Sequence, residues 1–88
     1  MSTREEIAAL ILELLAPSVI DAGIDRRTLT GDTDLRAAGI IDSLRFVQLL
    51  SELELRLGVA LDLADLDPAS LTRLDPLSSF IASAVATR

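Results

Sequence analysis

The chain has 88 residues, half of them apolar, and its fourteen acidic residues against eight arginines give a net charge of −6 at pH 7. This length predicts one domain over residues 1–88, and the acidic balance argues against binding to nucleic-acid phosphates. The chain has no cysteine and no histidine, which excludes disulfides, metal sites built on those ligands, and an imidazole base.

The composition predicts an all-α protein, because only two residues are aromatic and the core must be built from Leu, Ile, Val and Ala. A first helix is predicted to begin at Ser2 or Thr3, each at capping-box spacing from a glutamate. It is predicted to end between Ala16 and Asp21, where Pro17 stops or kinks it.

From Asp21 to Asp42 the sequence predicts a long loop, because glycines and turn-forming aspartates punctuate it. Loops of this length are unusual in a small domain and are often functional. Asp34 is expected to cap a single turn over residues 35–38. Four apolar residues are expected to anchor the loop in the core: Leu29, Leu35, Ile40 and Ile41.

A second long helix is predicted from Ser43 to about Leu57, opened by Asp42 as the N-cap and closed by Gly58. Its apolar residues cover more than one stripe, so contacts on two sides are expected. These residues are Leu44, Phe46, Val47, Leu49, Leu50, Leu53 and Leu57.

The sequence after Gly58 predicts an extended segment over residues 59–61, a short helix around Leu63 and Leu66, and a last helix that begins between Thr72 and Asp75. The last helix is expected to carry five residues inward: Leu77, Phe80, Ile81, Ala84 and Val85. The expected architecture is an antiparallel four-helix bundle with a short third helix and a long loop between helices 1 and 2.

The acidic residues form no recognisable metal motif. Asp32 and Asp34 lack the closing glutamate of a calcium loop, so turn formation explains them better. Asp62, Asp65 and Asp67 are interpreted as helix starts and solvating charges. We expect no metal site and no catalytic residue, because the chain has no histidine, cysteine or lysine to activate a nucleophile.

The first six residues lack the basic segment of a signal peptide, and no apolar run is long enough to span a bilayer. These features predict a cytoplasmic monomer with no membrane insertion.

Ser43 is the most informative residue of the sequence. At the first helical position its hydroxyl points outward, and the positive end of the helix favours an attached anion. The simpler interpretation is that Asp42 and Ser43 only start a helix well. The surrounding pattern distinguishes the two interpretations: Leu35-x-x-x-Gly39-x-x-Asp42-Ser43-Leu44, Val47, and Leu71-x-x-Leu74-x-x-Leu77.

On these residues the chain resembles carrier proteins of the acyl, peptidyl or aminoacyl superfamily, and the resemblance covers nearly the whole sequence. It implies that a phosphopantetheinyl transferase moves 4′-phosphopantetheine from coenzyme A onto Ser43. Cargo would then be loaded as a thioester by an adenylating ligase or acyltransferase and delivered to downstream biosynthetic enzymes. The resemblance also gives Asp42 a second role, as a carboxylate near the transferase's metal-bound coenzyme.

The Gly-Ile-Ile-Asp-Ser segment is most similar to free-standing aminoacyl carriers of the D-alanyl type, and Arg45 and Gln48 stand where fatty-acid carriers present acids. Both features favour a specialised pathway of the polyketide or nonribosomal peptide type. The expected partner contacts are Leu44, Arg45, Val47 and Gln48, although Leu44 could equally belong to the core. The alternatives are a fatty-acid-synthesis carrier and a helical interaction module that is never pantetheinylated.

Overall fold

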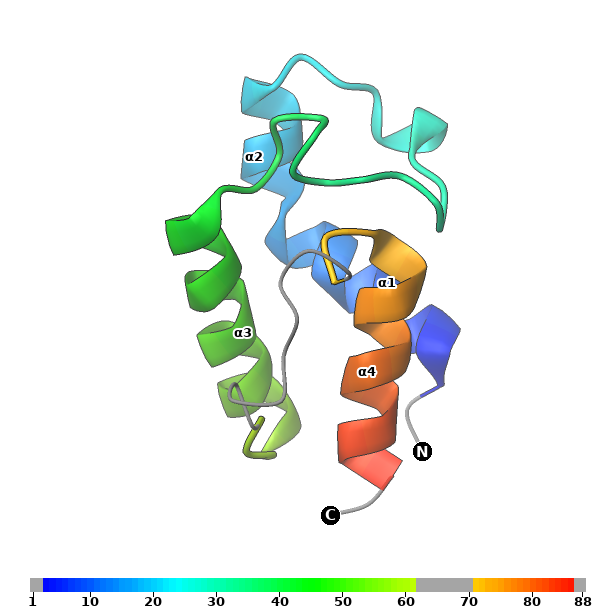
Figure 1. Cartoon of the computed structure of the whole chain (residues 1–88), viewed down its shortest axis with the longest axis vertical. Helices are drawn as coiled ribbons and strands as arrows, with labels where there is room; N and C mark the ends of the chain where they lie inside the picture. Colours follow the sequence, from blue (N-terminus) through cyan, green and yellow to red (C-terminus); the bar gives the residue numbers. More distant parts are fainter. Residues whose placement is uncertain (1–2, 62–70, 87–88) are drawn as a thin grey trace.

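The computed structural model describes residues 3–61 and 71–86, and α-helices dominate both ranges (Figure 1). The helices are α1 (Arg4–Leu14), α2 (Ala16–Asp21), α3 (Ser43–Leu57) and α4 (Leu74–Ala86), with a short 3-10 helix, η1 (Arg26–Thr28), between α2 and α3. No β-strand occurs in the described ranges, so the predicted all-α fold is confirmed. The short helix predicted around Leu63 and Leu66 lies outside the described residues.

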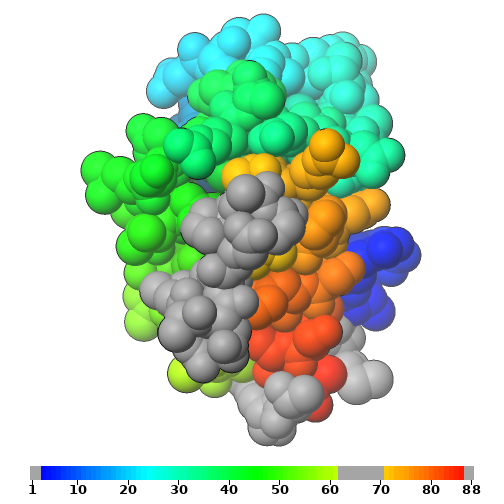
Figure 2. Space-filling model, in the orientation of Figure 1, coloured from blue at the N-terminus to red at the C-terminus, as the bar shows by residue number. Residues whose placement is uncertain are grey.

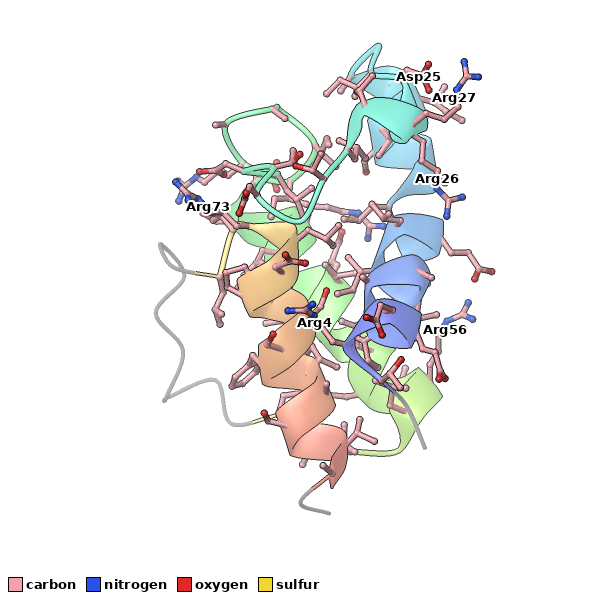
Figure 3. All side chains as sticks on the ribbon, turned by 90° about the vertical axis from the view of Figure 1, so that its right-hand side faces the viewer. Arg4, Asp25, Arg26, Arg27, Arg56 and Arg73 are labelled. Atoms are coloured by element: carbon pink, nitrogen blue, oxygen red, sulfur yellow. The ribbon has the colours of Figure 1, made fainter. Side chains whose placement is uncertain are left out.

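The helices form a bundle around one apolar core. α1 and α2 run toward one end of the molecule, whereas α3 and α4 both run back (Figure 1 and Figure 3). α1 is therefore antiparallel to α3 and α4, and it packs most extensively against α4. The most deeply buried core side chains are Ile7, Ile11, Leu15, Leu35, Leu49, Leu50, Leu53, Leu77 and Ile81.

The N-terminal cap of the first helical segment agrees with the prediction, and a break near Pro17 divides the segment. The Thr3 hydroxyl oxygen accepts the Glu6 N–H at 3.2 Å, which satisfies one of the unpaired amides of the first turn. Leu15 interrupts the helix, and α2 follows with Pro17 in its first turn, where a missing N–H is tolerated. The first helix thus stops at Leu14, before the predicted range for its end, and a separate helix continues to Asp21 with Val19 buried.

The long loop is pinned to the start of α4 by backbone hydrogen bonds. The first two N–H groups of α4, those of Leu74 and Asp75, donate to the carbonyls of Thr33 at 3.3 Å and Gly31 at 2.9 Å. In the opposite direction, the Leu35 N–H donates to the Thr72 carbonyl at 2.8 Å. The loop thus supplies acceptors for helix amides that have no partner within α4 itself.

Two aspartates fold the loop locally. Asp34 accepts the N–H groups of Arg36 at 3.0 Å and Ala37 at 3.1 Å, which confirms the predicted capped turn. The Ala37 hydrogen bond is the largest cause that lowers the pKa of Asp34, and burial opposes it. At the outer tip, the Asp25 carboxylate and the Arg27 guanidinium point toward one another and pair at 3.0 Å (Figure 3).

Helix α3 has the predicted boundaries. Asp42 caps its first turn, and Gly58 ends it in the left-handed conformation (φ 66°) with its N–H on the Glu54 carbonyl. The apolar arc of this helix is only partly buried, because Leu44 is 68% exposed and Val47 is 49% exposed. The core face of α3 consists of Phe46, Leu49, Leu50 and Leu53.

One arginine ties the first turn of α3 to the end of α1. The Arg45 guanidinium donates to the Leu14 carbonyl at 2.8 Å and lies 3.5 Å from the Glu52 carboxylate. Leu14 is the last residue of α1, where the carbonyl groups carry partial negative charge. A cation placed there satisfies a carbonyl next to the break between α1 and α2.

The Leu50→Ala variant is expected to lower the free energy of unfolding by about 2–5 kcal/mol, because truncating a core leucine leaves a cavity. Leu50 is 1% exposed, whereas Leu55 on the same helix is 84% exposed and provides the control, Leu55→Ala. Urea denaturation followed by circular dichroism measures both variants. Similar losses in the two variants would show that the faces of α3 are wrongly assigned.

The Arg45→Met variant keeps the apolar stem and removes the guanidinium. We expect the free energy of unfolding to fall by about 1–3 kcal/mol, because the Leu14 carbonyl loses its charged donor. The control is Glu52→Gln, which keeps the bond to Leu14 and is expected to cost at most about 1 kcal/mol. If Glu52→Gln proved as costly as Arg45→Met in the same urea titration, the carbonyl contact would not be the stabilising one.

Candidate functional site

The chain leaves the core immediately before the predicted site. Ile40 and Ile41 are both buried, and both donate their N–H groups to the Leu35 carbonyl, at 2.9 and 3.2 Å. The next two residues, Asp42 and Ser43, are exposed. The predicted serine therefore stands at the surface, directly after an anchored stretch of loop.

Gly39 makes this exit possible. It adopts a φ of 79°, in the left-handed region that residues with a side chain rarely adopt. A Cβ atom at this position would meet no atom within 4 Å, so the constraint is conformational and not one of space. The reversal at Gly39 turns the chain back so that Ile40 and Ile41 enter the core.

Asp42 and Ser43 have the geometry of a helix start. The Asp42 side chain accepts the Arg45 N–H at 2.7 Å, and its backbone carbonyl accepts the Phe46 N–H at 2.9 Å. Ser43 is the first residue of α3, at the positive end of the helix dipole. An anion bound to the Ser43 oxygen would lie next to the first amides of α3.

Two hollows flank this helix start. A pocket of about 150 Å³ adjoins Ser43 and is lined by Arg36, Ile41, Asp42, Ser43, Phe46, Val47 and Thr72. A wider depression of about 510 Å³ separates α2 from α3, with Asp21, Leu44, Arg45 and Gln48 among its lining residues. Figure 2 shows the last part of the loop and the first turns of α3, in green, as one continuous exposed surface that reaches the upper left.

The predicted partner contacts divide into two groups. Leu44, Val47 and Gln48 are exposed on α3, close to Ser43. Arg45 forms the second group, because its side chain is only 22% exposed and is held by Leu14 and Glu52. The break after α1 provides the carbonyl that draws this arginine inward.

Sequence reasoning did not include Arg36 and Thr72 in the site, although both line the pocket beside Ser43. Arg36 arrives there through the turn that Asp34 caps. Thr72 arrives through the pairing of the loop with the start of α4. The capped turn was a usable signal for Arg36, whereas no local signal in the sequence places Thr72.

The described residues contain no group of three or more His, Cys, Asp or Glu side chains that could hold a metal ion. Asp62, Asp65 and Asp67 lie outside the described residues. Within the described part of the chain, no helix has the length and apolar character needed to cross a bilayer.

The site suits a covalently attached anionic group. It offers an exposed hydroxyl at a positive helix end, an adjoining pocket with apolar walls, and no histidine, cysteine or lysine that could act as a base. The chain holds Ser43 in an accessible position at the start of α3.

Comparison with known proteins agrees with this chemistry. The family model for the phosphopantetheine attachment site matches residues 6–74, a range that contains the loop, α3 and the start of α4. No match was found among curated proteins or among solved structures. Carrier domains of this family are generally not catalytic themselves and work with a phosphopantetheinyl transferase and partner enzymes. The chain therefore belongs to the phosphopantetheine-binding carrier family, and its prosthetic group is 4′-phosphopantetheine.

Proposed function

We propose that Ser43 is the attachment residue and that the protein carries acyl or aminoacyl groups in a specialised biosynthetic pathway of the polyketide or nonribosomal peptide type. The observation that carries the proposal is the position of Ser43. It is an exposed first residue of α3, directly after the buried Ile40 and Ile41, inside the range that matches the family. The terminal thiol of the prosthetic arm holds the cargo as a thioester.

The residues of this chain act by positioning. Asp42 fixes the first turn of α3 and thereby the direction of the Ser43 side chain. The helix dipole contributes about 0.3–1 kcal/mol to a nearby anion, so it favours the phosphodiester without being needed to retain it. The transferase supplies the base, because the chain has no histidine, cysteine or lysine to act as one.

The exposed surface beside Ser43 is suited to bind a partner through apolar contacts. Leu44, Val47 and Gln48 present no charge, and the charge of Arg45 is engaged by Leu14 and Glu52. Residues at the desolvated centre of an interface are the ones that contribute most to binding. The uncharged Leu44, Val47 and Gln48 favour a specialised carrier over one that meets basic partners through a row of acids after the serine.

Incubation with coenzyme A and a broad-specificity phosphopantetheinyl transferase is expected to add one phosphopantetheine to the wild-type chain, measured as intact-protein mass. The Ser43→Ala variant should gain nothing. Ser51 is an exposed serine on the same helix, so Ser51→Ala should be modified fully. A wild-type chain that stays unmodified beside a modified control carrier would contradict the carrier function. Modification of Ser43→Ala would contradict the site.

The Leu44→Ala variant is expected to lower kcat/KM for transfer of the arm by about fivefold or more, since truncating a central contact residue typically costs more than about 1 kcal/mol. The stability of the protein should change little, because Leu44 is 68% exposed. Leu55→Ala, at the far end of α3, is the control and should leave kcat/KM unchanged. An unchanged rate in Leu44→Ala would place the transferase contact elsewhere.

A further inference from the structure

The pocket of about 150 Å³ beside Ser43 has no part in the function described so far. We propose that it binds the proximal segment of the prosthetic arm itself, with the arm's geminal dimethyl group inside the pocket and Arg36 paired with the phosphodiester. This proposal rests on attachment at Ser43.

The charges around Ser43 indicate that Arg36 is the residue that pairs with the phosphodiester. Attachment at Ser43 puts a phosphodiester beside the exposed carboxylate of Asp42, so two negative charges become neighbours. Arg45 is the nearest arginine in the sequence, but its guanidinium is engaged by Leu14 and Glu52. Arg36 is exposed and lines the same pocket as Asp42 and Ser43. A guanidinium can donate two parallel hydrogen bonds to phosphate oxygens, which suits it to this position.

The apolar walls match the next chemical group of the arm. Beyond the phosphate, the first apolar group of phosphopantetheine is a quaternary carbon with two methyl groups, only a few bonds from the serine oxygen. Ile41, Phe46 and Val47 line the pocket beside that oxygen, and Val47 follows Ser43 by one helical turn on the same face. The dimethyl group therefore reaches these walls without unfolding any part of the site, and its burial there removes apolar surface from water.

The volume of the pocket beside Ser43 fits the proximal segment of the arm better than a long acyl cargo. A dry cavity of about 150 Å³ holds one benzene ring, which is about six carbon atoms. A quaternary carbon with its two methyl groups and the adjoining carbons has this size, whereas a long acyl chain exceeds it. The lining includes Thr72, which is buried and whose side chain hydrogen-bonds Asp34. This part of the pocket is therefore tied to the loop that pairs with the start of α4.

The test uses the intact holo-protein, labelled with ¹³C and ¹⁵N, carrying an unlabelled arm added from coenzyme A. Isotope-filtered nuclear Overhauser spectra should show cross-peaks from the two geminal methyl groups to the Val47 methyls and the Phe46 ring, and none to Leu55. Val47→Thr puts a hydroxyl into the apolar wall at constant shape and should remove most of this intensity. Val47 is 49% exposed, so the fold should tolerate the change; Val47→Ala is the second variant if it does not.

The phosphodiester is followed separately by its ³¹P chemical shift. Arg36→Gln should move this signal and weaken the methyl cross-peaks. Arg56→Gln is the matched control, since Arg56 is also exposed but lies in the last turn of α3, in the lower half of the molecule (Figure 3), and it should change neither.

Different results would contradict the attachment at Ser43 and the binding of the arm in the pocket. A chain whose mass shows no arm on Ser43 overturns both the attachment and the pocket assignment. A chain whose mass shows the arm, but whose geminal methyl groups give no cross-peaks to Val47 or Phe46, overturns the pocket assignment alone. Cross-peaks that persist unchanged in both Val47→Thr and Arg36→Gln overturn it equally.

Discussion

The burial of two consecutive isoleucines determines where the serine of this protein stands. Ile40 and Ile41 are 3% and 5% exposed, and each contributes about 1.5–3 kcal/mol relative to an exposed position. Their amides share the Leu35 carbonyl, so the backbone is fixed as firmly as the side chains. A shift of one residue would expose an isoleucine or draw the serine inward. The core therefore fixes the register of Ser43.

The loop before α3 is held firmly despite its length. Its carbonyl groups accept the amides of Leu74 and Asp75, the first two of α4. Together with the hydrogen bond from Leu35 to the Thr72 carbonyl, these bonds attach the loop to the start of α4. Arg45 makes a corresponding link on the other side, from the first turn of α3 to the end of α1. The helix that carries the serine is thus braced at its start by both halves of the chain. Its exposed apolar residues remain available for other proteins.

Local signals in the sequence predicted the elements well, and contacts between distant segments limited the prediction. Asp42 and Gly58 mark the ends of α3 because capping depends on neighbours in the sequence. Arg45 could not be placed from its own surroundings, because its acceptor is the carbonyl of Leu14 in another helix. The same reason hid Thr72, which reaches the pocket through a strand-like pairing, whereas the turn that brings Arg36 there is local.

Pattern and geometry contribute differently to the assignment of function. The spacing around Ser43 was enough to indicate the carrier family, which the match over residues 6–74 then showed. The sequence left open whether Leu44 lies in the core, and the structure places it in solvent. In the proposed function, the cargo and the pathway depend on the partner enzymes.

The placement of the helix ends has a practical consequence. α1 begins at the lower right and α4 ends at the bottom of the molecule, whereas α3 begins at the upper left (Figure 1). A bead, a sensor surface or a fluorescent label coupled near Thr3 or Ala86 would therefore lie away from the serine. Immobilised in this way, the protein would direct its reactive face into solution, where soluble enzymes could be titrated against it without steric obstruction.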